Sequence, residues 1–296
     1  MRSIWRNAAA LAAALLFLLV ATPAQAQDAA ALRARHEGLQ AALADSPFRR
    51  PLLIHSDASS QQLAAGDVHA VIDHPYRVLA AALRQPRHWC ELLLLQSNIK
   101  RCRQADSGPE PQLELAIGRK FDQPAEDAYR LALRFAVPAA RADYLRVQMD
   151  ADHGPLGTRD YKLTLEAVPL DARRSYVHMS YSYASGPLAS LAVNAYLATT
   201  GRHKVGFSVV GRDEQGQPIH VSGMRGVAER NAMRYFLAIE AALAALSLPA
   251  EQRLERRLND WFAATERYPR QLHEMEREDY LALKRKEARQ PVAAAS

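Results

Sequence analysis

The sequence predicts an α+β fold in which one antiparallel sheet packs on a single face against a long helix. Residues 66–103 have the pattern of a strand, two short helices and a second strand. Five segments between residues 113 and 183 then alternate apolar and polar side chains with period two. Residues 225–246 form the longest helical pattern. Strands with one apolar and one polar face are typical of an antiparallel sheet that is covered on one side.

The first 26 residues have the features of a secretory signal peptide. Arg2 and Arg6 precede an apolar run at 8–21, and Ala24-Gln25-Ala26 is a small-x-small cleavage site. We therefore expect an exported, periplasmic protein that begins after residue 26 and keeps no integral membrane span. An uncleaved membrane anchor is the alternative.

The charge of the expected mature chain does not indicate nucleic-acid binding. Of 38 Lys and Arg residues, Arg2 and Arg6 belong to the signal, which leaves 36 basic against 32 acidic residues and a net charge of +4. These charges are spread along the chain, with no dense basic block interleaved with aromatic residues. Basic patches of that kind are what nucleic-acid interfaces require.

Residues 27–62 are predicted to form an N-terminal helix, an edge strand and a polar loop. The helix spans 27–45 and is rich in Ala, Leu and Arg. The short strand at 51–55 begins with Pro51, a position that edge strands tolerate.

The segment 66–103 predicts four elements from its prolines and its apolar pattern. His74-Pro75 ends a strand at 67–73, because a residue before proline is disfavoured in the α region. Helices follow at 76–84 and 87–95, separated by Gln85-Pro86, and a strand returns at 98–103. The only two cysteines, Cys90 and Cys102, lie in the second helix and this strand. In an oxidising compartment such a pair is expected to form a disulfide.

The rest of the chain continues as strands and then helices. The predicted elements are strands at 113–117, 131–135, 145–149, 161–165 and 177–183, a helix at 188–199, strands at 205–209 and 219–222, and helices at 225–246, 250–266 and 270–287.

This order resembles the START-like (SRPBCC, helix-grip or polyketide-cyclase-like) superfamily. The residues that carry the resemblance are His74-Pro75, Val78, Leu83, Pro86 and Trp89. The resemblance covers roughly residues 65–248 and implies a helix-grip domain at 63–248, with the sheet curved around the helix 225–246 and a ligand cavity between them. It also implies an apolar or amphipathic small-molecule ligand, possibly a lipid. The chain departs from the family in the helix at 188–199, in a helical extension at 249–290 and in a disordered tail at 291–296.

The helix 225–246 is predicted to present one face to the sheet. That face carries Val227, Ala228, Asn231, Tyr235, Ala238, Ile239, Ala242 and Leu246. Asn231 and Tyr235 would be polar groups on an apolar wall, and Ala238 would leave room for a ligand, as in a small-molecule pocket. The alternative is a filled core in which Asn231 and Tyr235 bond to the backbone.

A charged cluster opens the same helix. Arg225 and Glu229 are expected opposite the apolar face, and Arg230 and Arg234 beside it. Arg230 could grip an anionic group of a ligand bidentately, although a solvated or salt-bridged face is the favoured interpretation. Tyr181 and Tyr183 fall on the apolar face of their strand and could stack on a flat ligand; they are also ordinary strand-forming residues.

No catalytic signature, cofactor site or metal site is recognised in the sequence. His273-Glu274 lacks the second histidine of a zinc-binding HExxH helix. An enzyme of the cyclase or hydrolase kind, with Asp73, His74 or Tyr235 as acid or base, is one alternative to a binding protein. A non-ligand interaction module with a filled core is the other.

The two C-terminal helices carry Leu254, Leu258, Trp261 and Phe262 among mixed acidic and basic residues. Because the charges are mixed, packing onto the domain is favoured over contact with a membrane surface.

Overall fold

The computed structural model describes residues 24–57, 63–105, 110–186, 191, 195 and 202–289. Most of the expected signal peptide and of the expected helix at 188–199, and the tail 291–296, lie outside these residues. No helix in the described part of the chain combines the length and the apolar character needed to cross a membrane.

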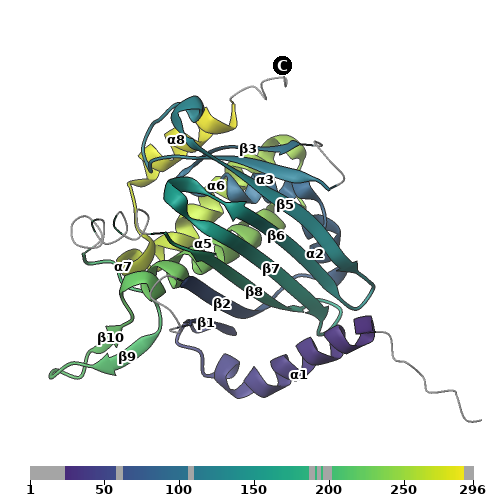
Figure 1. Cartoon of the computed structure of the whole chain (residues 1–296). Helices are drawn as coiled ribbons and strands as arrows, with labels where there is room; N and C mark the ends of the chain where they lie inside the picture. Colours follow the sequence, from purple (N-terminus) through teal and green to yellow (C-terminus); the bar gives the residue numbers. More distant parts are fainter. Residues whose placement is uncertain are drawn as a thin grey trace, which may run out of the picture.

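The main sheet has eight antiparallel strands in the order β1-β2-β8-β7-β6-β5-β4-β3 (Figure 1). The eight strands predicted before residue 184 are confirmed, with β1 at one edge as Pro51 indicated. The strands are β1 Leu52–Ser56, β2 Leu63–Ile72, β3 Ile99–Ala105, β4 Gln112–Ile117, β5 Tyr129–Ala140, β6 Leu145–His153, β7 Arg159–Pro169 and β8 Ser175–Ala184.

Two short helices connect β2, which lies beside the edge strand β1, with β3, which forms the other edge of the sheet. They are α2 Tyr76–Leu83, which begins directly after Pro75, and α3 Pro86–Leu93, whose first residue is Pro86. Trp89 is fully buried, and its Nε1 donates a hydrogen bond to the Leu83 carbonyl at 2.6 Å. The predicted disulfide is present between Cys90 and Cys102, with their Cα atoms 5.1 Å apart. It ties α3 to β3.

The long helix α5 Gly223–Ala245 lies in the curve of the sheet, where it packs against β1, β2 and β8. Its approach to β2 is close: a β-carbon on Gly66 would lie 3.0 Å from the Ala228 carbonyl oxygen. Helix α6 Ala250–Glu266, whose predicted bounds are confirmed, packs against α5. The fold is α+β with a helix-grip arrangement.

The charged cluster at the start of α5 is largely buried, so of the two favoured interpretations the salt-bridged one is found, with Arg234 paired with Glu274, and the solvated one is not. Glu229 is 0 % exposed. Its carboxylate accepts hydrogen bonds from Ser56 Oγ at 2.7 Å and from the backbone amides of Phe207 and Ser208 at 2.6 and 2.9 Å. Arg225 pairs with Ser56 instead of with Glu229.

The strands expected at 205–209 and 219–222 do not extend the main sheet. They form a separate hairpin of β9 Val209–Arg212 and β10 Pro218–His220, which projects from the body of the molecule (Figure 1). Next to this hairpin the two predicted segments still pair, since Val221 N donates to the Ser208 carbonyl at 2.8 Å and Gly206 N to the Val221 carbonyl at 2.7 Å, while the amides of Phe207 and Ser208 bond to Glu229.

The helix expected at 270–287 is divided into α7 Pro269–Leu272 and α8 Arg277–Ala288. The break at 273–276 turns the Glu274 side chain inward, where Ser97, Lys120 and Arg234 bind it. Those tertiary contacts override the local helical pattern.

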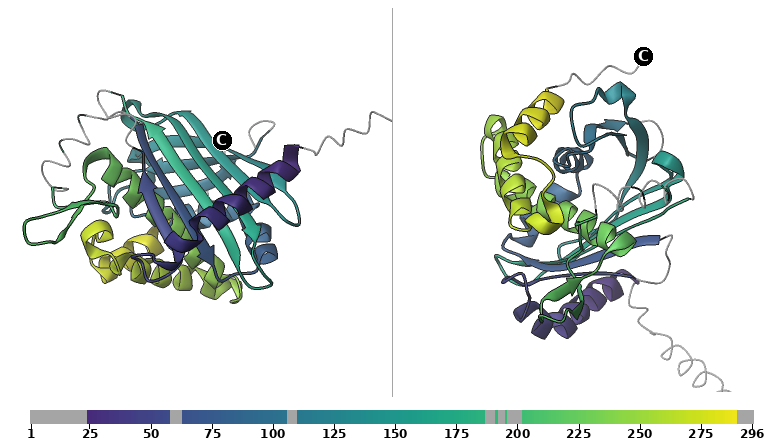
Figure 2. Two further views of the ribbon diagram at one scale, coloured as in Figure 1. Left: turned by 90° about the horizontal axis from the view of Figure 1, so that it is seen from below. Right: turned by 90° about the vertical axis from the view of Figure 1, so that its left-hand side faces the viewer.

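The N-terminal helix α1 Ala24–Ala44 crosses the convex face of the sheet (Figure 2). Its side chains Ala29, Leu32 and Leu43 share a small apolar cluster with Tyr176 of β8 and with Tyr144, which directly precedes β6. The two faces of the sheet are therefore covered by different parts of the chain.

Candidate ligand cavity

A cavity of about 380 Å³ lies between the first half of α5 and strands β4 to β8. Gly66 brings α5 close to β2, whereas the sheet curves so that β3 to β5 turn around α3 (Figure 2). Space is therefore left between α5 and the middle of the sheet. The cavity is also bordered by the end of α3 and by the β6–β7 connection, which contains the short turn η2 Pro155–Gly157.

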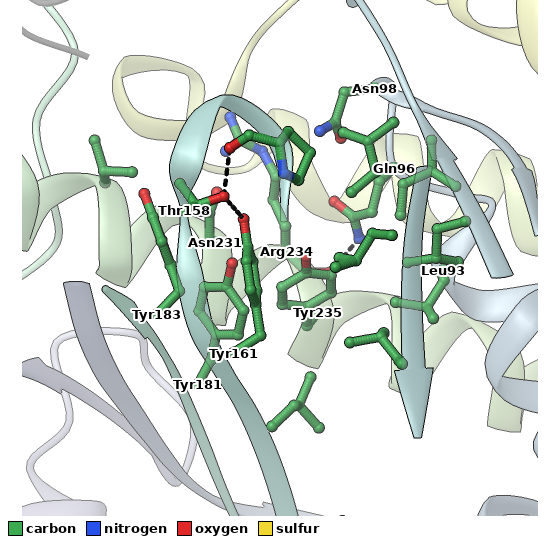
Figure 3. A pocket seen from close by; sticks show the side chains of 18 of the residues that line it. Leu93, Gln96, Asn98, Thr158, Tyr161, Tyr181, Tyr183, Asn231, Arg234 and Tyr235 are labelled. Carbon is green, nitrogen blue, oxygen red and sulfur yellow. Dashed lines mark hydrogen bonds between the residues drawn. The ribbon is translucent and has the colours of Figure 1, made fainter. Parts of the chain in front are cut away.

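One wall of the cavity is formed by four tyrosines from three elements (Figure 3). The rings of Tyr161 and Tyr183 stack with centroids 5.3 Å apart, and Tyr181 meets Tyr235 edge to face at 5.2 Å. The Tyr161 hydroxyl donates to Thr158 Oγ1 at 2.7 Å. Interlocked rings of this kind make a rigid wall.

Burial keeps these phenols neutral. It raises the pKa of Tyr235 to about 12 and that of Tyr181 well above its usual value near 10. It also raises the pKa values of Tyr161 and Tyr183. At neutral pH the wall therefore presents aromatic faces and hydroxyl groups without negative charge.

The remaining wall is aliphatic. Leu115, Leu131, Leu133, Met149 and Leu163 point from successive strands of the sheet into the cavity, and Leu93 lies at the end of α3. These side chains belong to the same apolar cluster as the core of the domain. A ligand that lay against them would be shielded from water along its length.

A polar cluster closes one end of the cavity around the carboxylate of Glu274. Ser97 Oγ donates to Glu274 Oε2 at 2.9 Å, and the Lys120 ammonium lies 2.6 Å from Oε1. Arg234 of α5 also pairs with Oε1. Burial alone would raise the pKa of Glu274, but Arg234, Lys120 and the Ser97 hydroxyl lower it to about 2. This carboxylate is therefore ionised at neutral pH.

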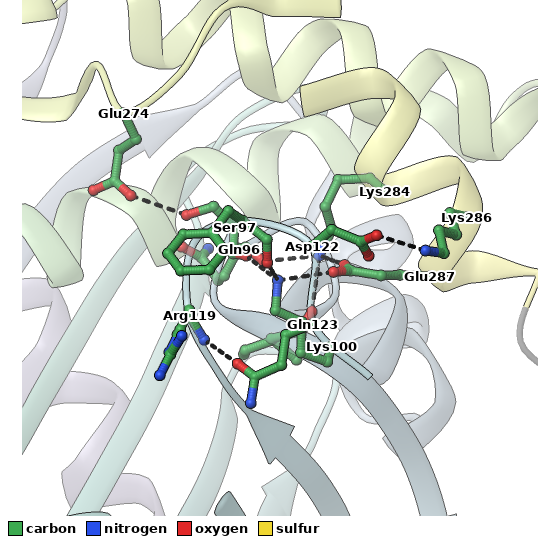
Figure 4. Close-up of polar contacts among 12 residues, drawn as sticks. Gln96, Ser97, Lys100, Arg119, Asp122, Gln123, Glu274, Lys284, Lys286 and Glu287 are labelled. Carbon is green, nitrogen blue, oxygen red and sulfur yellow. Dashed lines mark hydrogen bonds and ion pairs between the residues drawn. The ribbon is translucent and has the colours of Figure 1, made fainter. Parts of the chain in front are cut away.

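The C-terminal extension holds this end of the cavity in place through buried lysines (Figure 4). Lys100 Nζ donates to the carbonyls of Ser97 and Phe121 and lies 2.9 Å from Glu287 Oε1. Lys284 Nζ donates to the carbonyls of Gln96 and Ile99 and binds the other oxygen of Glu287. Residues Gln96, Ser97 and Ile99 themselves line the cavity. Helix α8 therefore supports the wall from behind.

The structure places five of the six predicted ligand-binding residues at the cavity. They are Arg230, Asn231, Tyr235, Tyr181 and Tyr183. The prediction that Ala238 lines it was wrong, because Ala238 is 0 % exposed within the packed part of the core, one turn beyond the end of the cavity. The face of α5 that was predicted from the sequence does point toward the cavity, but it continues along the helix beyond the end of the cavity.

The residues named for the enzyme alternative are not brought together. Asp73 and His74 lie in a separate groove with Arg50 and Glu240, whereas Tyr235 faces the cavity. Among the described residues no three His, Cys, Asp or Glu side chains are grouped so that they could hold a metal ion.

Sequence reasoning missed Lys120, Glu274, Gln96 and Thr158. Glu274 attracted notice only as part of an incomplete zinc motif, and Lys120 lies in a loop with no periodic pattern. Each reaches the cavity from a connection between elements, so no helical or strand period could have pointed to it.

A comparison with solved structures finds distant similarities. The Zhui aromatase/cyclase from Streptomyces sp. R1128 has a TM-score of 0.37 at 12 % identity, over 65 % of this chain and 96 % of that one. Norcoclaurine synthase from Thalictrum flavum, in a complex with dopamine and hydroxybenzaldehyde, has a TM-score of 0.32 at 19 % identity, over 49 % and 84 %. A conserved protein from Geobacillus kaustophilus has a TM-score of 0.34 at 10 % identity, over 61 % and 95 %.

No family model matches the chain, and no curated protein matches it. The structural similarities are too low in score and identity for any residue role or activity to be transferred. What this site can do must therefore be argued from its own geometry.

Proposed function

We propose that this chain binds an apolar or amphipathic small molecule in the cavity between the sheet and α5. The observation that carries the proposal is the cavity itself, about 380 Å³ with aromatic and aliphatic walls and polar groups gathered at one end. Small-molecule sites are typically concave, mostly apolar and roughly 300–1,000 Å³ in volume, with a few polar groups that orient the ligand. A filled core, as an interaction module would have, leaves no such space.

Binding is favoured over catalysis by the ionisation of the cavity residues. An acid–base catalyst works best when its pKa lies near the operating pH. The pKa of Glu274 is held at about 2, and that of Tyr235 is raised to about 12. Neither group is poised to exchange a proton at neutral pH. Of the residues named for the cyclase or hydrolase alternative, Tyr235 is the one at the cavity, and its raised pKa does not suit it to acid–base catalysis at neutral pH.

A neutral fluorescent dye tests the proposal. N-phenyl-naphthylamine brightens in apolar surroundings, so it should fluoresce with the parent protein and be displaced by apolar competitors. Val227 lines the cavity, and Val227→Trp should abolish dye binding with little loss of thermal stability, because the indole enters empty space. Val78→Trp is the matched control, since Val78 is exposed on α2, and it should bind the dye as the parent does.

Two results would count against binding in this cavity. One is a parent protein that never takes up the dye. The other is a Val227→Trp variant that folds and binds it unchanged.

We also propose that the protein acts in the periplasm after cleavage of residues 1–26. The Cys90–Cys102 disulfide supports this, because disulfides persist in oxidising compartments. N-terminal sequencing of protein recovered from a periplasmic fraction should find a chain that begins at residue 27. A full-length chain in the membrane fraction would contradict the proposal. Native mass spectrometry of the same material would show whether the bound molecule is a lipid.

A further inference from the structure

Positive charge predominates in the cavity. Among the described residues that line it, four are cationic, Lys120, Lys162, Arg230 and Arg234, and one is anionic, Glu274. Burying charge without a compensating partner is unfavourable. Lys162 is exposed, whereas Lys120 and Arg234 pair with Glu274 at the polar end and the buried Arg230 lines the same cavity, so an anionic group of a ligand would meet positive charge there.

The two arginines are buried where a ligand would lie. Arg230 is 3 % and Arg234 is 8 % exposed, and both project from the first half of α5 into the polar end of the cavity. The buried Nε of Arg234 has no hydrogen-bond acceptor among the described residues, although its Nη2 binds Glu274. A guanidinium offers several N–H donors in a planar fork that matches a carboxylate.

The cations are also close enough together to affect one another. Lys204, whose ammonium donates to the His273 carbonyl, lies near the same cluster. Desolvation lowers the pKa of Lys204 and of Lys120; Glu274 opposes the change, and Arg234 and Arg230 add to it. This mutual repulsion is what an additional anion would relieve.

The polar end lies beside the tyrosine wall and leads to the aliphatic side chains of the sheet (Figure 3). We infer that the ligand is an amphipathic carboxylate, whose charged group lies among Arg230, Arg234 and Lys120 and whose apolar body extends toward Leu131, Leu133 and Met149. This inference rests on the proposed function and names the class of its ligand.

Three probes with the same chain and different head groups test the inference: decanoate, decanol and decylamine. Competition with N-phenyl-naphthylamine measures all three at neutral pH. Decanoate should bind at least about tenfold more tightly than decanol, since one hydrogen bond to a charged group strengthens binding by about that factor. Decylamine should bind most weakly, because its ammonium meets like charge.

Two variants assign the effect to the polar cluster. Lys120→Met should weaken decanoate about tenfold and leave decanol unchanged, because only the anion uses the ammonium. Glu274→Gln removes the competing carboxylate and should strengthen decanoate binding. Lys286→Met is the matched control, an exposed lysine of α8 paired with Asp122, and it should leave all three affinities unchanged.

The outcomes separate the inference from the proposed function. If decanol binds and decanoate binds no more tightly, the inference fails and the proposed function stands. The inference also fails, and the proposed function stands, if Lys120→Met weakens the binding of decanol as much as that of decanoate. If neither the dye nor any of the three probes binds, the proposed function fails. If Glu274→Gln does not fold, Lys120→Met still tests the inference. The Lys120 side chain is 44 % exposed, so its replacement should leave the fold intact.

Discussion

The sheet-facing stripe of α5 has two regions that differ in what they meet. From Val227 to Tyr235 the stripe borders a cavity and carries Asn231 among neighbouring arginines. From Ala238 onward it lies beyond the cavity, and Ala238 and Ile239 are fully buried in the core. Small apolar residues on a helix therefore do not by themselves indicate a cavity. Small residues allow close packing, whereas polar residues facing inward mark where packing stops.

A tryptophan placed in the packed region should have the largest effect. Ala238→Trp inserts an indole where no space exists, so the free energy of unfolding should fall by about 3 kcal/mol or more. Denaturant unfolding measures the loss. The same residue at Val227, in the cavity region, should cost much less stability. Equal losses at the two positions would mean that the regions do not differ in packing.

Acid should weaken the cavity end through Glu274. Its pKa is about 2 in the folded protein against an ordinary value of 4.5. The ionised carboxylate therefore contributes stability that is complete above pH 4.5 and is lost as the pH falls toward 2, roughly 3 kcal/mol in all. Glu274→Gln should be less stable at neutral pH and should lose less stability between these two pH values.

Glu278→Gln is the control for this pH dependence. Glu278 lies in the first turn of α8, and its side chain is 82 % exposed. Unfolding curves of this variant should keep the acid dependence of the parent. If Glu274→Gln also kept it, the ion pairs of Glu274 would not stabilise the fold.

A smaller effect is expected at the tyrosine wall. Tyr161→Phe removes the hydrogen bond to Thr158 and should lower the free energy of unfolding by about 1 kcal/mol. The ring stack with Tyr183 stays, so dye binding should change little. Unfolding and dye titration of one preparation measure both. A complete loss of dye binding would show that the hydroxyl, and not only the ring, shapes the cavity.

Most elements of the fold could be predicted because their signals are local. Helix α2 begins directly after Pro75 and α6 begins at Ala250, as predicted, and α3 begins at Pro86. The period-two segments became strands of one sheet because each alternates apolar and polar residues. The cysteine pairing was predictable as well, since the chain contains only Cys90 and Cys102.

The errors arose where a distant part of the chain supplied the deciding contact. Glu229 was predicted opposite the apolar face of α5, yet it is fully buried and accepts hydrogen bonds from the amides of Phe207 and Ser208. The pattern at 270–287 favoured one helix, yet the contacts of Glu274 with Ser97 and Arg234 divide it. A hydrophobic period cannot report such contacts, because it describes only the element to which it belongs.

The sequence was enough to predict most of the strands and helices, the disulfide and the direction in which α5 faces the sheet. The elements and the direction of α5 follow from residues near one another in the chain. The disulfide follows because the chain contains no third cysteine. Tertiary structure alone decided where the cavity ends and which charges meet in it. Lys120, Arg234 and Glu274 come from three separate elements, and their charges interact only because the sheet curves around α5 and the C-terminal extension folds back over it.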